Sequence, residues 1–168
     1  MQKVNCLPGR RQIAVFGCIV LLVVLVDQLS KSWIRANLAW GETLFDIGFF
    51  RIIHVQNTGV AFGMFKDHAA VFITLAVVAA IIILFLFLFM RRFWPFLDNT
   101  MVLVAMGMIL GGVIGNNLID RIVRGHVTDF LDFKVWPVFN VADSSGVVGA
   151  ILIGVYLLFL YKPAAESE

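Results

Sequence analysis

The sequence predicts an all-α integral membrane protein with four membrane-spanning helices and a small β-sheet at the outer membrane face. Hydrophobic residues make up 61% of its 168 residues, whereas soluble domains are roughly half apolar. Charged residues are 14% of the chain and cluster between long apolar segments. A helix needs about 20 apolar residues to cross a bilayer. We therefore expect spans at about residues 13–37, 69–90, 100–119 and 141–161, within one membrane domain over residues 1–168.

The composition also excludes several classes of function. A net charge of +2 is too small to indicate a nucleic-acid-binding protein. The three histidines are scattered, and the two cysteines, Cys6 and Cys18, lie in or near the first span. We therefore expect neither a metal site nor a disulfide framework. The sequence has no phosphate-binding glycine loop, so we expect no nucleotide and no other cofactor.

The first span follows a short basic head and is uninterrupted and apolar over residues 13–26. A cleaved signal peptide has the same beginning, but no polar cleavage region follows here. Asp27 and Lys31 are spaced i,i+4 near the end of this helix. They predict either an ion-paired helix end, with Lys31 reaching to the membrane surface, or a functional role for Asp27. Both interpretations stay open.

Residues 40–68 are too few for a soluble domain and predict the small sheet. Residues 49–56 are β-forming with partial alternation, and the turn signal Asn57-Thr58-Gly59 follows them. The stretch 60–65 is apolar and contains a glycine. We expect a sheet at the membrane surface, with residues 60–65 as a flexible flap over the neighbouring site.

Small residues recur every four positions in the third and fourth spans. They are Gly107, Gly111 and Gly115 in the third span and Gly146, Ala150 and Gly154 in the fourth. Rows of this kind allow helices to approach closely. We interpret both rows as packing faces rather than as chemical sites.

Four spans place both termini on the same side of the membrane. Basic residues are denser on that side, where they are Lys3, Arg10, Arg11, Arg91, Arg92 and Lys162. The denser side is cytoplasmic by the positive-inside rule. The sheet and the polar segment 117–144 are therefore expected at the outer face.

The polar segment 117–144 holds the strongest candidates for chemistry. Asp129 and Asp143 lie 14 positions apart with a loop between them, and both are close to membrane depth, where an ionisable group indicates function. Two carboxyls held together in a poorly solvated site share a proton, so one is ionised and the other protonated. Aspartic proteases use that arrangement without a metal ion or a nucleotide. Asp132 is a rival for Asp129 but lies nearer the middle of the loop.

Other interpretations of these acidic residues also fit the sequence. Asp143 could be only a helix cap, and Asp120 could be a structural partner of Arg124 at i,i+4. Asp27, Asp120 and Asp143 could instead lie on a proton or ion path in a small transporter or channel subunit. A purely structural subunit of a membrane assembly is the third class. Composition and spacing alone leave these classes open.

Five motifs in order resemble signal peptidase II, the bacterial lipoprotein signal peptidase. They are Asp27-Gln28-Leu29-Ser30-Lys31, Asn57-Thr58-Gly59-Val60-Ala61-Phe62-Gly63, Asn117-Leu118-Ile119-Asp120-Arg121, Gly125-His126-Val127-Thr128-Asp129-Phe130 and Phe139-Asn140-Val141-Ala142-Asp143-Ser144. The resemblance extends from Asp27 to Gly149. Each motif is weak alone, but five in the family's order on four spans are a specific signal.

The resemblance implies an aspartyl endopeptidase of the bacterial inner membrane with Asp129 and Asp143 as its catalytic pair. It also implies substrate-binding or supporting roles for five further residues, namely Asn57, Asn117, Arg121, Asn140 and Asp27. The implied substrate is a prolipoprotein, cut just before a cysteine that carries diacylglycerol. The expected partners are this substrate and membrane lipid, without nucleic acid, and the expected state is a monomer.

The sequence departs from the family pattern at two places. The family usually has glycine directly before the asparagine of its Asn-x-x-Asp-Arg motif, but here Asn116 precedes Asn117 and Gly115 lies one position early. Helix packing near Gly115 is therefore expected to shift. The loop between Asp129 and Asp143 is also short for the family.

Overall fold

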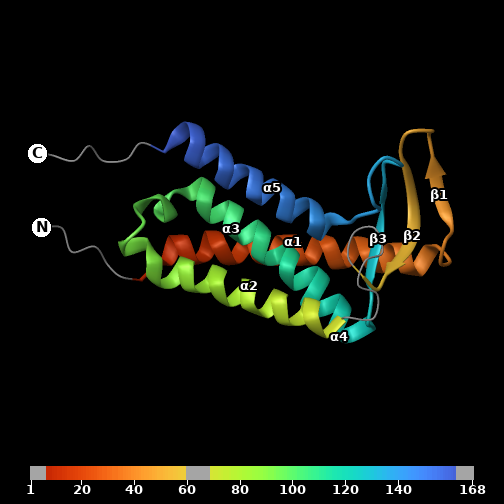
Figure 1. The fold of residues 1–168 in the computed structure, drawn as a ribbon, viewed down its shortest axis with the longest axis horizontal. Coiled ribbons are helices and arrows are strands. Elements are labelled where there is room, and N and C mark those ends of the chain that lie inside the picture. The colour runs from red at the N-terminus through yellow and green to blue at the C-terminus, as the bar shows by residue number, and fades with distance from the viewer. Residues whose placement is uncertain (1–6, 60–68, 162–168) are drawn as a thin grey trace, which may run out of the picture.

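The computed structural model describes residues 7–59 and 69–161. Its long helices lie side by side, and a small sheet covers one end of them, while the described chain begins and ends at the opposite end (Figure 1). The long helices are α1 (Arg10–Asn37), α2 (Ala69–Phe89), α3 (Thr100–Val113) and α5 (Val141–Val155). Among the described residues, four helical segments are long and apolar enough to cross a membrane. The predicted architecture is confirmed.

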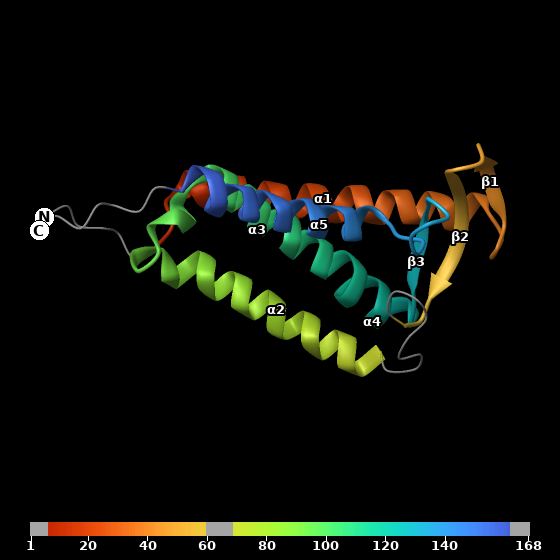
Figure 2. The same cartoon turned by 45° about the horizontal axis from the view of Figure 1, so that its top comes forward.

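The third span is longer than the sequence suggested. After α3 the helix continues as a π-helical turn, η4 (Ile114–Asp120), and then as the short α4 (Arg121–Arg124). The fourth span likewise ends in a π-helical turn, η5 (Tyr156–Leu160). Two 3₁₀ turns, η2 (Met90–Arg92) and η3 (Pro95–Asp98), connect α2 to α3. Figure 2 shows α2 diverging from α1 and α5 toward the sheet end, where it stays beside the third span at η4 and α4.

The glycine row of the third span packs against α1, as predicted. A Cβ atom on Gly111 would lie 2.7 Å from Val23 Cβ, and one on Gly115 would lie 2.6 Å from Asp27 Oδ2. Real Cβ atoms do not approach other atoms so closely, so both positions require glycine. Gly115 thereby brings the third span against the carboxylate of Asp27.

The corresponding prediction for the fourth span is wrong. Gly146 and Gly154 face open space, and Ala150 is exposed. The close contact falls on Gly149, where a Cβ atom would lie 2.7 Å from the carbonyl oxygen of Ala105. The four-residue row indicated the wrong face of this helix, because α3 packs against the face of α5 that carries Ala142, Ser145 and Gly149.

The sheet has three antiparallel strands in the order β1-β2-β3. They are β1 (Thr43–Asp46), β2 (Arg51–Asn57) and β3 (Val127–Asp132). The sequence predicted a sheet within residues 40–68 and did not predict β3. Because β3 pairs with β2, Asp129 lies opposite Val55 and beside the end of β2 at Asn57. The predicted flap at residues 60–65 lies outside the described residues.

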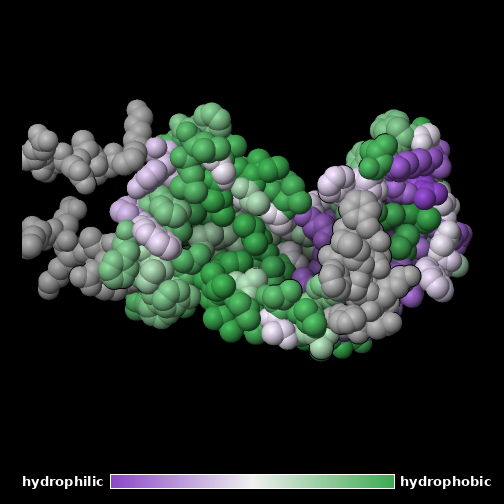
Figure 3. Space-filling view, viewed as in Figure 1, coloured by the Kyte–Doolittle hydropathy of each residue, from purple (hydrophilic) through white to green (hydrophobic). Residues whose placement is uncertain are grey.

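The surface separates into an apolar body and a polar end (Figure 3). Large apolar side chains are exposed along the helices, as expected for a surface that contacts lipid. Hydrophilic residues gather on the sheet and in the hollow between the sheet and the helices. A small buried cluster of Ile34, Leu38 and Phe130 joins α1 to β3 and fixes the sheet on the bundle.

Candidate active site

A polar cavity of about 190 Å³ lies where the sheet meets the helices. Asp129 enters it from β3 and Asp143 from the first turn of α5. The lining is completed by residues of β2 and the turn after it, α2, the third span and β3, namely Asn57, Gly59, Phe72, Asn116, Asn117, Arg121 and Val127. The structure therefore brings together the two carboxyls that the sequence predicted as a pair.

Asp129 is buried, with 2% of its surface exposed. Its Oδ2 accepts a hydrogen bond from Asn57 Nδ2 at 2.9 Å, and its Oδ1 accepts one from Asn140 Nδ2 at 2.6 Å. Burial raises the pKa of this carboxyl from 3.8 to about 7, and the negative charge of Asp143 adds to the effect. The two amide donors act in the opposite direction but are weaker. Asp129 can therefore hold a proton near neutral pH.

Asp143 is the third residue of α5 and takes part in its capping box with Asn140. The backbone N–H of Asn140 donates to Asp143 Oδ2 at 3.1 Å, and Asn116 Nδ2 donates to Oδ1 at 2.7 Å. The N-terminus of a helix also favours a negative charge. Asp143 is thus both a helix cap and a cavity residue, so these two interpretations do not exclude each other.

Three asparagine amides are oriented toward the carboxyls by donors on their own oxygen atoms. Asn57 Oδ1 accepts from the N–H of Gly59 at 3.0 Å, and Asn140 Oδ1 accepts from the N–H of Asp143 at 3.0 Å. Asn116 Oδ1 accepts from Lys31 Nζ at 2.5 Å. Because each oxygen is engaged in this way, each NH₂ group must face an aspartate. The carboxyls are surrounded by donors of fixed direction.

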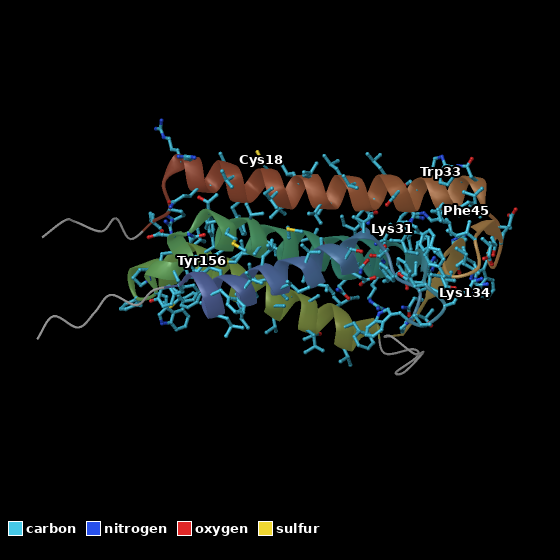
Figure 4. All side chains as sticks on the ribbon, turned by 90° about the horizontal axis from the view of Figure 1, so that it is seen from above. Cys18, Lys31, Trp33, Phe45, Lys134 and Tyr156 are labelled. Carbon is cyan, nitrogen blue, oxygen red and sulfur yellow. The ribbon has the colours of Figure 1, made fainter. Side chains whose placement is uncertain are left out.

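Lys31 is fully buried, so the expectation that it reaches the membrane surface is wrong. Its Nζ lies 2.8 Å from Asp27 Oδ2 and 2.7 Å from Asp120 Oδ2, the second contact being an ion pair rather than an aligned hydrogen bond. Figure 4 shows Lys31 pointing from α1 into the bundle. The predicted pairing of Asp120 with Arg124 is also wrong, because Asp120 faces Lys31. A buried ammonium needs such partners.

Asp27 does not line the cavity but contacts the start of α5, the helix that carries Asp143. Its Oδ1 accepts a hydrogen bond at 3.0 Å from the backbone N–H of Ala142, in the first turn of α5. A carboxylate on α1 therefore caps the helix that carries Asp143. Of the two interpretations of Asp27, the ion pair is present, and the same side chain also positions α5.

Arg121 connects the third span to the turn after β2. Its Nη2 donates to the carbonyl oxygen of Gly59 at 2.7 Å, and its Nε donates to Asn117 Oδ1 at 3.2 Å. The guanidinium also lies 4.9 Å from the ring centre of Phe72. Arg121 therefore holds the edge of the cavity, together with Asn117, and does not simply balance Asp120.

Asp132, the rival carboxylate, is outside the cavity. Its Oδ2 lies 2.6 Å from Arg51 Nε, and its Oδ1 accepts from the backbone N–H of Lys134 at 2.7 Å. The first contact joins the paired ends of β2 and β3, and the second holds the start of the loop that follows β3. The structure thus gives Asp132 a structural place and leaves Asp129 facing Asp143.

Asn116 is a polar cavity residue that was not predicted as part of the site, and Phe72 is an apolar one. Asn116 joins the buried ion cluster to Asp143, since it accepts from Lys31 and donates to Asp143. The sequence did contain a signal for this residue, because Asn116 occupies the place where the family usually has glycine. The π-helical turn at Ile114–Asp120 widens the helix there. Such turns occur often at functional sites.

The described residues include no group of three or more His, Cys, Asp or Glu side chains placed to hold a metal ion. The cavity instead offers the carboxyls of Asp129, whose pKa is raised to about 7, and Asp143, with amide donors and one guanidinium around them. This set can remove a proton from water and donate a proton to a carbonyl oxygen.

Comparisons with known proteins agree with this chemistry. The sequence profile of the family described as Signal peptidase (SPase) II matches residues 19–159. The lipoprotein signal peptidase of Dehalococcoides mccartyi strain CBDB1 is 47% identical over 86% of this chain and 88% of its own length. That of Moorella thermoacetica is 42% identical over 90% and 96%.

Solved structures show the same fold. A bacterial membrane enzyme determined by the in meso method at 2.3 Å resolution superposes with a TM-score of 0.78 and 28% identity, over 93% of this chain and 94% of that one. A second, at 1.9 Å, gives a TM-score of 0.74 and 29% identity over 89% and 96%. From the profile match and the close relatives together, this chain belongs to the signal peptidase II family.

Proposed function

We propose that Asp129 and Asp143 hydrolyse the peptide bond that joins a signal peptide to a prolipoprotein. As a member of the signal peptidase II family, the chain is an aspartic peptidase that removes signal peptides from prolipoproteins. The observation that supports the catalytic assignment is the shared cavity, which both carboxyls line and in which fixed amide donors surround them.

The two carboxyls have different surroundings, which suggests different roles. Asp129 has a pKa raised to about 7 by burial and by Asp143, so it supplies the proton. Asp143 lies at the N-terminus of α5 and accepts from Asn116 and from the backbone of Asn140, contacts that favour a carboxylate, so we assign it the role of the base.

Hydrolysis then proceeds in two steps. Asp143 accepts a proton from a water molecule while that water attacks the carbonyl carbon, and Asp129 donates its proton to the carbonyl oxygen. The tetrahedral intermediate collapses when the C–N bond breaks. The leaving nitrogen takes the proton from Asp143, and Asp129 regains its proton from the hydroxyl of the intermediate. The products are a free carboxyl on the signal peptide and a free amine on the lipoprotein.

The remaining predicted residues hold this pair and its substrate. Asn57 and Asn140 fix Asp129, and Asp27 fixes the helix of Asp143 through the N–H of Ala142. Arg121 and Asn117 line the cavity wall opposite, where a guanidinium can hold a substrate carbonyl at two points.

We further propose that the substrate carries diacylglycerol on the cysteine after the cleaved bond, and that the enzyme is a monomer with no nucleic-acid partner. The four apolar spans and the membership of a bacterial peptidase family support a location in the bacterial inner membrane. The basic residues near both termini favour the cytoplasm for that end, which leaves the cavity near the outer face. A substrate anchored in the bilayer then meets water and both carboxyls at one depth.

The transporter alternative is not favoured. It needs Asp27 and Asp120 on a path that ions or protons can follow, but Lys31 engages both carboxylates in a fully buried cluster. Because Lys31 neutralises both carboxylates, the cluster offers no free site for a passing ion or proton.

The test is incubation of the purified protein with a diacylglyceryl-modified prolipoprotein, scored for the released signal peptide. Wild type should cleave it, Asp143→Asn should not, and Asp132→Asn should retain most activity. Asp132→Asn is the matched control because Asp132 lies on β3, three residues after Asp129, but outside the cavity. Cleavage by Asp143→Asn at a rate near that of wild type would remove the catalytic assignment.

A further inference from the structure

A second, apolar groove of about 570 Å³ begins on the other side of Asp143. It lies between the loop that follows β3 and the first turns of α5. Its lining is aromatic and aliphatic except at one end, and comprises Phe133, Val135, Trp136, Phe139, Asp143, Ser144, Val147 and Val148. Asp143 therefore lines both the polar cavity and this groove.

The loop that forms one wall of the groove is held in place. Lys134 Nζ lies 2.7 Å from Asp46 Oδ1 at the end of β1, and the backbone N–H of Lys134 donates to Asp132. The Phe133 ring stacks on that of Phe139 with centroids 5.9 Å apart, and it also contacts Phe50 at 4.9 Å. The groove is consequently preformed and does not need a bound ligand to take shape.

The groove is open toward the surroundings of the bundle. Val135 is 91% exposed and Trp136 is 66% exposed, and Val147 and Val148 lie on an outward face of α5. In a membrane-spanning protein this face meets lipid, and an aromatic residue such as Trp136 is typical of the membrane interface. A chain can therefore enter the groove sideways from the bilayer.

We propose that this groove holds an acyl chain of the lipid attached to the substrate's cysteine. The inference rests on the proposed function, in which that cysteine directly follows the cleaved bond. A lipid on this residue leaves the scissile bond within one side chain of the two aspartates. A groove that starts at Asp143 and continues along α5 into the bilayer has the required origin and direction.

The chemistry of the lining distinguishes an acyl chain from a peptide. Peptide N–H and C=O groups need hydrogen-bond partners when they are removed from water. Beyond Asp143 the groove has one polar side chain, Ser144, whose hydroxyl already donates to the carbonyl oxygen of Asn140 at 2.9 Å. The polar cavity opposite has amides and Arg121 for the peptide. The two sides of Asp143 therefore suit the two chemically different parts of one substrate.

The first experiment locates the chain directly. The probe is a prolipoprotein peptide whose diacylglyceryl group carries a photoreactive group at the end of one acyl chain, bound to the full-length Asp129→Asn protein in lipid nanodiscs. Mass spectrometry after illumination should find adducts on the segment 133–139 and on Val148, which line this groove alone. Adducts on Ile109 or Val113, which line a different cavity beside Asp143, would place the chain between α3 and α5 and overturn the proposal.

A second probe separates the substrate's chain from ordinary membrane lipid. A phospholipid with the same photoreactive chain is added to the same nanodiscs, and unlabelled substrate peptide is then titrated in. If the groove belongs to the substrate, the peptide should displace the phospholipid's adducts from residues 133–139. Persistence of these adducts at saturating peptide means that the groove holds membrane lipid only, and the proposal is wrong.

Turnover supplies an independent measure. Val148→Trp fills the groove, whereas Val155→Trp makes the same change two helical turns away on α5, outside the lining. We expect Val148→Trp to lower kcat/KM by about tenfold or more, because misplacing a scissile bond by about 1 Å can cost up to about 100-fold. Val155→Trp should stay near wild type, and equal rates for the two variants would contradict the proposal. Failure of wild type itself to cleave the peptide would refute the proposed function, whereas cleavage with adducts elsewhere would refute only the groove.

Discussion

Replacing Asp129 with asparagine should abolish turnover and at the same time change how stability depends on pH. The carboxyl of Asp129 is 2% exposed, and burial together with Asp143 raises its pKa to about 7. An amide in its place keeps the size of the side chain but neither donates a carboxyl proton nor titrates. The variant therefore tests the catalytic role and the bound proton in one protein.

The sign follows from proton binding on folding. In the unfolded chain this carboxyl has its ordinary pKa of 3.8, so the folded protein with a pKa of about 7 binds a proton that the unfolded chain has lost. The contribution of this proton to the free energy of unfolding is fully present below about pH 4, and it is lost as the pH rises through about 7. At about 1.36 kcal/mol per pKa unit, wild type should lose about 3 kcal/mol from pH 5 to pH 8 through this group.

The assay is the free energy of unfolding in one detergent at pH 5, 6, 7 and 8 for wild type and Asp129→Asn. Other titrating groups are common to both proteins, so the difference between them isolates the proton shared by Asp129 and Asp143. The difference should move in favour of the variant by about 3 kcal/mol over this range. The difference also has a part that does not depend on pH. The new amide of the variant faces the NH₂ group of Asn57 or Asn140, and this unfavourable contact costs about 1–3 kcal/mol.

Asp132→Asn is the control for this measurement. Burial acts to raise the pKa of Asp132, but the N–H of Lys134 and the Arg51 guanidinium outweigh it and lower the pKa. Asp132 is therefore ionised in both folded and unfolded chains above pH 5, and its variant should show a flat difference. A flat difference for Asp129→Asn as well would refute the reasoning that Asp129 holds the proton, and turnover near wild type would refute the catalytic pair itself.

Four further outcomes are expected. Arg121→Lys should lose most turnover, about tenfold or more, with an unfolding temperature near that of wild type, because a point charge cannot hold a carbonyl as the guanidinium fork does; a rate loss matched by unfolding would contradict this. Lys31→Met should cost about 3–5 kcal/mol in the free energy of unfolding, since it leaves two buried carboxylates unpaired, and unchanged stability would mean that the cluster is not ionised. Asn116→Asp should move the acidic limb of the pH–rate profile up by about one unit, because a like charge beside Asp143 favours its protonated form; a uniform rate loss without that movement would indicate only a structural role. Chelators should leave the rate unchanged, since two carboxyls suffice for the chemistry, and a loss restored by one divalent ion would argue against the mechanism.

The parts of the fold that were predictable depend on local composition. A bilayer requires about 20 apolar residues per helix, so each span was visible in its own sequence. Strand β3 was not visible, because Val127–Asp132 is a short segment with two aspartates whose extended form depends on pairing with β2, far away in the chain. Asp129 on β3 was found through its chemistry and through the family resemblance, and not through its secondary structure.

The buried ion cluster shows the same limit. Asp27 and Lys31 were paired correctly because i,i+4 spacing on one helix is a local feature. Whether Lys31 turned outward or inward depended on Asp120 and Asn116, which are on another span and become neighbours only when α1 packs against it. The same packing explains why Asp120 pairs with Lys31 and not with Arg124, which is closer in sequence.

The π-helical turn at Ile114–Asp120 also indicates how a membrane-spanning helix at an active site can accept an inserted residue. A π-helical turn accommodates one residue more than the α-helix around it. Without Asn117, the sequence here would read Gly115-Asn116-Leu118-Ile119-Asp120-Arg121, which has glycine directly before the asparagine of an Asn-x-x-Asp-Arg motif, as is usual in the family. The extra residue can thus be regarded as an insertion confined to a single turn.

The flanks of this turn keep their partners. Upstream, Gly115 still lies against Asp27, and downstream Arg121 still reaches the carbonyl oxygen of Gly59. A helix that crosses an active site can in this way gain a residue without a change in the register of either half. Deletion of Asn117 should accordingly be tolerated far better than deletion of a residue in the α-helical part of the same span, where each such change rotates every following side chain by about 100°.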